Sequence, residues 1–133
     1  MDSLFVVAGV VLIFVGLLDV FFTVLHYDGF GFISSRLYRN VFKGVRYLTR
    51  PLPRRQRALG LSMAAPLMVP ITITAWISLV ALGYALIYYS AMDEEFFSLP
   101  GRTLEPSFLE ALYFSGTSIS TVGFGDITPT NTL

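Results

Sequence analysis

Hydrophobic residues gather in three stretches of the chain, and the first is an almost unbroken run from Leu4 to Leu25. Only Asp19 and Thr23 interrupt it. At 1.5 Å per residue the run is about 33 Å long, which is enough for one membrane-spanning helix. A signal peptide is the rival interpretation, but it would need a basic leader and a shorter apolar core. The leader here is acidic, so we expect a retained helix.

The second apolar stretch lies between Met63 and Tyr89 and predicts another spanning helix. Ile71 to Tyr89 alone holds 19 residues, which just suffices to cross the bilayer core. Pro66 and Pro70 belong either to the first turns of a longer helix or to a lead-in before it. Tyrosines at the far end of this stretch are typical of a membrane-interface aromatic belt.

Between these runs, apolar and basic residues recur with the period of a helix. Five basic residues follow one another at spacings of 3, 4, 3 and 4, which places them on one helical face. These residues are Arg36, Arg39, Lys43, Arg46 and Arg50. The pattern predicts an amphipathic helix at the membrane surface that ends at Pro51 and Pro53.

The third stretch, Pro106 to Ile119, predicts a short helix. Ser107 and Glu110 have the spacing of a capping box, and apolar residues follow with helical spacing. The helix is too short to span a bilayer, so we expect it to enter the membrane and stop midway as a re-entrant helix.

Composition supports a membrane protein and excludes several other classes. Apolar residues make up 54% of the 133, charged residues only 14%, and there is no cysteine. A disordered tail, a disulfide scaffold and a basic nucleic-acid binder are therefore excluded as first interpretations. A single His and the lack of an activated Ser leave no enzyme constellation, so we expect no enzymatic activity and no cofactor.

Although the net charge is zero, basic and acidic residues lie in different parts of the chain, and this separation predicts the orientation of the chain in the membrane. Eight of the nine basic residues lie between Asp28 and Gly60, whereas acidic residues predominate after Tyr89. By the positive-inside rule the basic connection is cytoplasmic, and the N-terminus and the segment after Tyr89 lie outside.

Two features have more than one interpretation: Asp19 in the first span, and the basic stripe formed by Arg36, Arg39, Lys43, Arg46 and Arg50. The stripe is either a solvated cytoplasmic face that enforces topology or a surface that binds anionic lipid. Voltage sensing and nucleic-acid binding are disfavoured, because the stripe lies outside the spans and is tethered between them. Asp19 is an intramembrane acid that either anchors the structure, by pairing with a loop Arg or bonding Thr23, or serves gating or proton sensing.

After the short helix, Thr121–Asp126 reads TVGFGD. Non-helical backbone at membrane depth is tolerated only where it lines a protein-walled or watery path. Gly123 and Gly125 can take positive φ values, so that successive carbonyls point to one side. Four such strands around one axis would stack rings of oxygens that replace the water shell of a cation.

At these residues the chain resembles the potassium-channel pore family, closely over Pro106–Pro129 and in general layout over Ile71–Leu133. The resemblance implies K⁺ binding at the carbonyls of Thr121, Val122, Gly123 and Phe124, with Gly125 completing the selectivity filter and Asp126 at the outer mouth. It also implies a homotetramer, because each chain supplies one filter strand. K⁺ is then the permeant ion.

Two features depart from the family pattern. Phe124 stands where Tyr is commoner, as in two-pore-domain channels, so the hydroxyl that would tie the filter to its surroundings is missing. The family's pore-lining inner helix is expected after the filter, whereas the sequence stops at Leu133. We therefore expect an incomplete subunit.

The sequence thus predicts an all-α membrane protein of the plasma membrane, with K⁺-selective passive transport as its function. The expected segments are a first transmembrane helix (1–27), a basic amphipathic cytoplasmic connection (28–62), a second transmembrane helix (63–90), an extracellular turret (91–105), and a pore helix with selectivity filter (106–133). A non-conducting regulatory or truncated subunit and a K⁺ transporter subunit are the alternatives.

Overall fold

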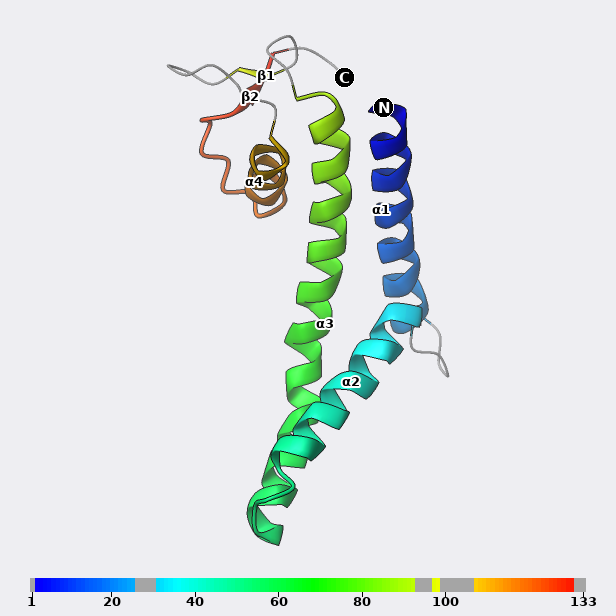
Figure 1. The fold of residues 1–133 in the computed structure, drawn as a ribbon, viewed down its shortest axis with the longest axis vertical. Helices are drawn as coiled ribbons and strands as arrows, with labels where there is room; N and C mark the ends of the chain where they lie inside the picture. The colour runs from blue at the N-terminus through cyan, green and yellow to red at the C-terminus, as the bar shows by residue number, and fades with distance from the viewer. Residues whose placement is uncertain (1, 26–30, 93–96, 99–106, 131–133) are drawn as a thin grey trace. The chain divides into compact units, whose positions relative to one another are not determined.

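The computed structural model describes residues 2–25, 31–92, 97–98 and 107–130 (Figure 1). Within these residues the chain forms α1 (Asp2–Leu25), α2 (Phe32–Leu48), α3 (Arg54–Ser90), β1 (Phe97–Ser98), α4 (Phe108–Ile119) and β2 (Thr128–Pro129). They divide into two compact units. The terminal unit comprises Met1–Val15 and Ser78–Leu133, and the middle unit comprises Gly16–Ile77.

Two of the described helices, α1 from Ser3 to Leu25 and α3, are long and apolar enough to cross a membrane. Their large apolar side chains are mostly exposed, as at Leu4 (71%) and Met63 (64%), which suits a surface that faces lipid. The predicted all-α membrane fold is confirmed. α3 begins at Arg54, well before the predicted start at Met63, and both Pro66 and Pro70 lie inside it.

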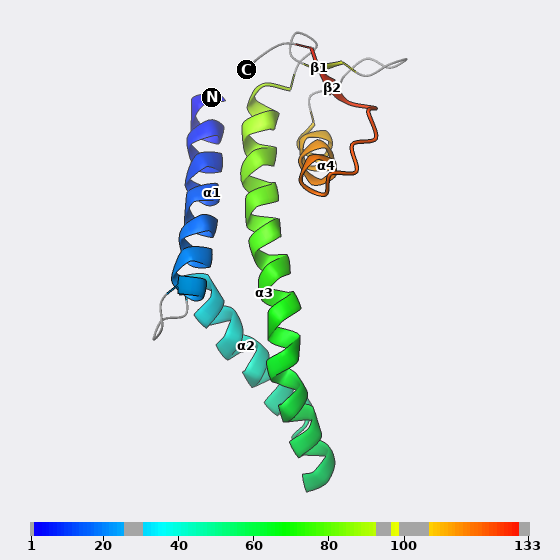
Figure 2. The same cartoon turned by 180° about the vertical axis from the view of Figure 1, so that it is seen from behind.

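In the middle unit, α2 and the first part of α3 form a helical hairpin, and both views show its turn at the same end (Figures 1 and 2). The hairpin closes tightly at Gly60, because a Cβ there would lie 2.6 Å from Thr49 Cγ2. The other end of α2 meets α1, where Gly31 lies against Asp19. Two points of close approach therefore fix α2.

In the terminal unit, α1 and α3 pack through facing glycines. A Cβ at Gly9 would lie 2.5 Å from the carbonyl oxygen of Gly83, so the two backbones touch as in other small-residue membrane interfaces. α4 is seen end-on in both views, so its axis lies across that of α3 (Figure 2).

A small aromatic core closes the terminal unit around α4. The rings of Tyr88, Phe97 and Phe114 contact one another edge to face, with centroids 5.0 to 6.1 Å apart. Ile127 is buried in the same cluster. β1 and β2 pair antiparallel, with Ser98 opposite Thr128. Most of the predicted turret, 91–105, lies outside the described residues.

Candidate functional site

The short helix α4 begins at Phe108 with Ser107 as its N-cap, and it is bonded to α3. The N-cap is as the sequence predicts, but the return bond from Glu110 that would complete the capping box is not formed among the described residues, where Glu110 Oε2 has no partner. The Ser107 hydroxyl oxygen accepts a hydrogen bond of 3.3 Å from the Leu109 backbone N–H. Further along, Ser115 is fully buried, and its hydroxyl donates to the carbonyl oxygen of Ala81 at 2.8 Å. With 12 residues α4 is about 18 Å long, which is too short to cross a bilayer core of about 30 Å.

The TVGFGD segment (Thr121–Asp126) follows α4, and its backbone φ alternates in sign from one residue to the next. Thr121, Gly123 and Gly125 have φ values of 58°, 50° and 73°. The expectation of positive φ at both glycines is confirmed, and Thr121 joins them. A left-handed β-branched residue is a rare and strained conformation, costing on the order of 1–3 kcal/mol, and such strain is found preferentially at functional sites. Every second residue is therefore left-handed.

Hydrogen bonds set the direction of the first carbonyls in this segment. The N–H groups of Val122 and Gly123 both point at the carbonyl oxygen of Thr117 in α4, at 3.1 and 3.4 Å. In a planar trans peptide the C=O points opposite to the N–H, and the described residues contain no cis bond. The carbonyls of Thr121 and Val122 are therefore directed away from Thr117 and α4.

The far end of the segment is tied back to α4 by Tyr113. Its hydroxyl donates to Asp126 Oδ2 at 2.7 Å, and its ring stacks on that of Phe124, with centroids 6.5 Å apart and planes at 4°. The hydrogen bond from Tyr113 lowers the pKa of the Asp126 carboxyl and raises the pKa of the Tyr113 phenol. No sequence pattern points to Tyr113, because nothing marks a residue 13 positions before Asp126 as its partner.

One side of the segment is left open by the described residues of this chain. Val122 and Phe124 are 55% and 68% exposed, and a Cβ at Gly123 or Gly125 would meet nothing within 4 Å among the described residues. Directly afterwards Ile127 is buried in the aromatic cluster. The segment is thus held along one side and at its end, and is open on the other side.

A second polar site lies in the middle unit around Asp19, which is only 3% exposed. Its carboxylate accepts hydrogen bonds from the backbone N–H groups of Ile33 (2.6 Å) and Ser34 (3.1 Å), and from the Ser34 hydroxyl. The Trp76 indole N–H donates to the same carboxylate at 3.0 Å. Because the free N–H groups and the dipole of a helix N-terminus favour an anion, Asp19 caps α2 from a different helix.

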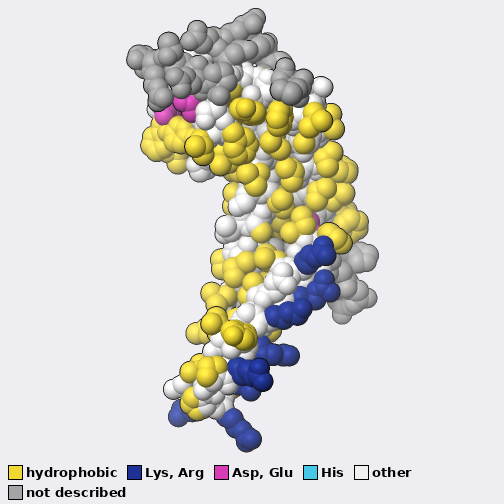
Figure 3. Space-filling view, in the orientation of Figure 1, with side chains coloured by type: hydrophobic (Ala, Val, Ile, Leu, Met, Phe, Trp, Pro, Cys, Tyr) yellow, Lys and Arg dark blue, Asp and Glu magenta, His cyan; other side chains and the backbone are white. Residues whose placement is uncertain are grey.

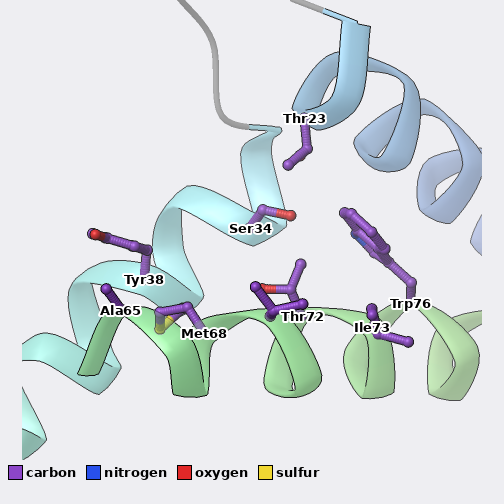
Figure 4. A pocket seen from close by; sticks show the side chains of 9 residues that line it. Thr23, Ser34, Tyr38, Ala65, Met68, Thr72, Ile73 and Trp76 are labelled. Atoms are coloured by element: carbon purple, nitrogen blue, oxygen red, sulfur yellow. The ribbon is translucent and has the colours of Figure 1, made fainter. Parts of the chain in front are cut away.

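These contacts correct the partners expected for Asp19. Neither a loop Arg nor Thr23 bonds to it among the described residues; Thr23 instead accepts from the Gly31 N–H at 2.9 Å. The anchoring role is supported by the four donors. Beside this junction lies an apolar cavity of about 360 Å³, between the Ser34 side of α2 and the Trp76 side of α3 (Figure 4).

The basic stripe is exposed along the middle unit, where the Lys and Arg side chains gather over α2 and the start of α3 (Figure 3). Arg36, Arg39, Lys43 and Arg46 lie on α2, whereas Arg50 lies in the turn beyond its end at Leu48. The Arg36 guanidinium also lies over the Phe32 ring, 5.4 Å from its centroid.

Comparison with known proteins points to ion channels. Residues 71–133, which include α4 and the TVGFGD segment, match the model of a family described as "Ion channel". The chain is also 34% identical over 131 residues to the uncharacterized membrane protein YdjJ of Bacillus subtilis, covering 97% of this chain. It spans only 36% of that relative's length. No solved structure matches the chain. The protein is thus an all-α membrane protein whose residues 71–133 are similar to an ion-channel domain.

Proposed function

We propose that the chain is a subunit of a potassium-selective channel, with the TVGFGD segment as its selectivity filter. The observation that carries this proposal is the left-handed backbone at Thr121, Gly123 and Gly125, combined with Thr121 and Val122 carbonyls directed away from α4. An oxygen-lined backbone of this kind replaces the hydration shell of a cation without any charged side chain. The family match over residues 71–133 supports passive ion conduction as the function.

The electrostatics of the surrounding residues favour a cation at this place. The C-terminal end of α4, at Ile119, directly precedes the segment, and a helix C-terminus carries partial negative charge. At the other end, Asp126 is held as a carboxylate by the Tyr113 hydroxyl. Both ends of the filter therefore present negative potential to an entering ion.

One chain supplies only one wall of such a pathway. Four copies around an axis would place four TVGFGD segments face to face, and the exposed glycine side of each would then meet its neighbours. A homotetramer is accordingly part of the proposal. In the proposed orientation, in the plasma membrane, the basic connection of residues 28–62 is cytoplasmic, and the N-terminus and the Asp126 end of the filter are outside.

Ion flux into liposomes that contain the full-length protein tests the proposal. We expect K⁺ uptake that Ba²⁺ blocks and that greatly exceeds Na⁺ uptake. Gly123→Ala should abolish selective uptake, because the left-handed conformation is costly for a residue with a Cβ. Gly44→Ala is the matched control, since a Cβ there meets nothing within 4 Å among the described residues and should leave uptake unchanged. Equal K⁺ and Na⁺ uptake by the unaltered protein would contradict the proposal.

A further inference from the structure

The turn between α2 and α3 brings together basic residues from both helices. Thr49 is buried at the end of α2, where its hydroxyl donates to the carbonyl oxygen of Val45 at 2.7 Å. The chain then reverses, and the Arg57 N–H bonds to the Pro53 carbonyl oxygen at 3.0 Å in the first turn of α3. The close approach of Gly60 to Thr49 holds the two helices together at this point.

Four cations line one concavity at this turn. Its volume is about 300 Å³, and its lining consists of Lys43, Arg46, Tyr47, Arg50 and Arg57. Three of the cations come from α2 and its end, and Arg57 comes from α3. Because α2 and α3 are joined by so short a turn, the hairpin itself creates this concentration of charge.

No acidic side chain near in sequence neutralises these cations. Residues 29–92 contain neither Asp nor Glu, and the described acid of the middle unit, Asp19, is already bound by Ser34 and Trp76. Like charges held in one concavity repel one another, so an anion from outside the chain is favoured there. Three guanidinium groups and one ammonium group match the oxygens of a phosphate, which Arg binds through paired hydrogen bonds.

Exposed apolar side chains beside the cations indicate that the phosphate belongs to a lipid. Tyr47 and Leu48 are 76% and 72% exposed, and Leu59 on α3 is 61% exposed. A second concavity of about 470 Å³ borders the first and is lined by Tyr47, Leu48, Arg50 and Pro51. A soluble phosphate needs no such apolar neighbours, whereas a lipid presents glycerol and acyl carbons directly below its phosphate.

The length of α3 is compatible with this assignment. Its 37 residues make a helix of about 55 Å, whereas the hydrocarbon core of a bilayer is about 30 Å thick. A tilted α3 that crosses the core therefore has its first turns at the level of the headgroups. The cationic concavity lies at these first turns.

We propose that Lys43, Arg46, Arg50 and Arg57 form a binding site for the phosphate headgroup of an anionic membrane lipid. This site is built by the α2–α3 turn and is distinct from the diffuse attraction of the whole basic stripe. It is independent of ion selectivity, so its test needs no flux measurement.

The test measures binding of a fluorescent phosphatidylglycerol to the full-length protein in neutral detergent, with fluorescent phosphatidylcholine as the neutral comparison. Phosphatidylglycerol should bind more tightly. The double variant Lys43→Gln/Arg57→Gln should weaken its binding about tenfold or more. Arg39→Gln/Arg55→Gln removes the same charge outside the concavity and should change binding by less than about threefold. Equal losses in the two double variants would overturn the built site in favour of a diffuse field.

A second pair of variants tests geometry at constant charge. Gly60→Ala should weaken phosphatidylglycerol binding, because its Cβ forces Thr49 and the end of α2 away from α3. Gly44→Ala, on the same hairpin, should not. If Gly60→Ala does not fold, the charge pairs still decide the question. Competition with inorganic phosphate distinguishes a lipid headgroup from free phosphate as the ligand. Displacement of the lipid by inorganic phosphate at concentrations near the dissociation constant of the lipid itself would overturn the lipid assignment.

Discussion

The Tyr113 hydroxyl donates a hydrogen bond of 2.7 Å to Asp126, and so joins the middle of α4 to the end of the TVGFGD segment. The bond needs an ionised Asp126 and a protonated Tyr113. The pKa of the Asp126 carboxyl is lowered from 3.8. The bond is therefore complete at pH values above 3.8 and is lost as the pH falls through the lowered pKa. The pKa of Tyr113 is raised from 10.0, so the alkaline limit lies above pH 10.

The first prediction is that Tyr113→Phe raises the pKa of Asp126 toward its ordinary value, because it removes the hydrogen bond that favours the carboxylate. A carboxyl NMR titration of the full-length protein measures this shift, with Asp126→Asn identifying the signal. The unaltered protein should show no titration of Asp126 between pH 5 and pH 8, which lies above its lowered pKa. An unchanged Asp126 pKa in Tyr113→Phe would contradict the role given to this bond.

The second prediction concerns Phe124, whose ring stacks on that of Tyr113 and is 68% exposed. Phe124→Tyr adds a hydroxyl at an open position and leaves the backbone carbonyl in place. We expect K⁺ selectivity to be retained and the time course of inactivation to change. Flux decay after a K⁺ step measures the change, and a loss of K⁺ preference would show that the Phe124 side chain itself sets selectivity.

The third prediction is that Asp19 anchors the middle unit. Asp19→Asn should lower the stability of the protein by on the order of 2 kcal/mol, because it removes the charge that accepts from two backbone N–H groups, Ser34 and Trp76. Trp76→Phe removes one of these donors and should cost less. Thermal unfolding in detergent compares the variants. Equal melting temperatures for Asp19→Asn and the unaltered protein would contradict an anchoring role.

The fourth prediction is that the contact between Gly9 and Gly83 holds α1 against α3 in the terminal unit. Gly9→Ala should destabilise the protein by about 1–3 kcal/mol, because its Cβ would lie 2.5 Å from the Gly83 carbonyl oxygen. Gly44→Ala is again the control, with an open position and an expected shift near zero. Thermal unfolding measures both, and similar shifts in the two variants would argue against this close contact.

Much of the fold follows from hydrophobic period alone. The long apolar runs predict α1 and the later part of α3, and the 3, 4, 3, 4 spacing of basic residues predicts α2. The start of α3 is not visible in this way, because Arg54, Arg55 and Arg57 read as a polar linker. Arg, Gln, Ala and Leu all have high helix propensity, and Pro53 is tolerated next to a helix start.

The TVGFGD segment and the Asp19 site can be predicted only in part from the sequence. The positive φ values of the two glycines in the TVGFGD segment can be predicted from their residue type. The left-handed conformation of Thr121 cannot, because a β-branched side chain disfavours it. Two of the four donors to Asp19 are backbone N–H groups, which every residue except proline has, so no residue type marks them. The other two, the Ser34 hydroxyl and the Trp76 indole, depend on how α2 and α3 pack around the carboxylate. The Tyr113–Asp126 bond likewise depends on how α4 and the segment fold back on each other.

Whether the TVGFGD segment selects K⁺ is decided by the reversal potential of the full-length protein in a planar bilayer. With K⁺ on one side and Na⁺ on the other at equal concentrations, we expect a reversal potential far from zero with the sign of K⁺ permeation. This potential should be lost in Gly123→Ala and retained in Gly44→Ala. A reversal potential near zero in the unaltered protein would contradict the selection of K⁺ by this segment.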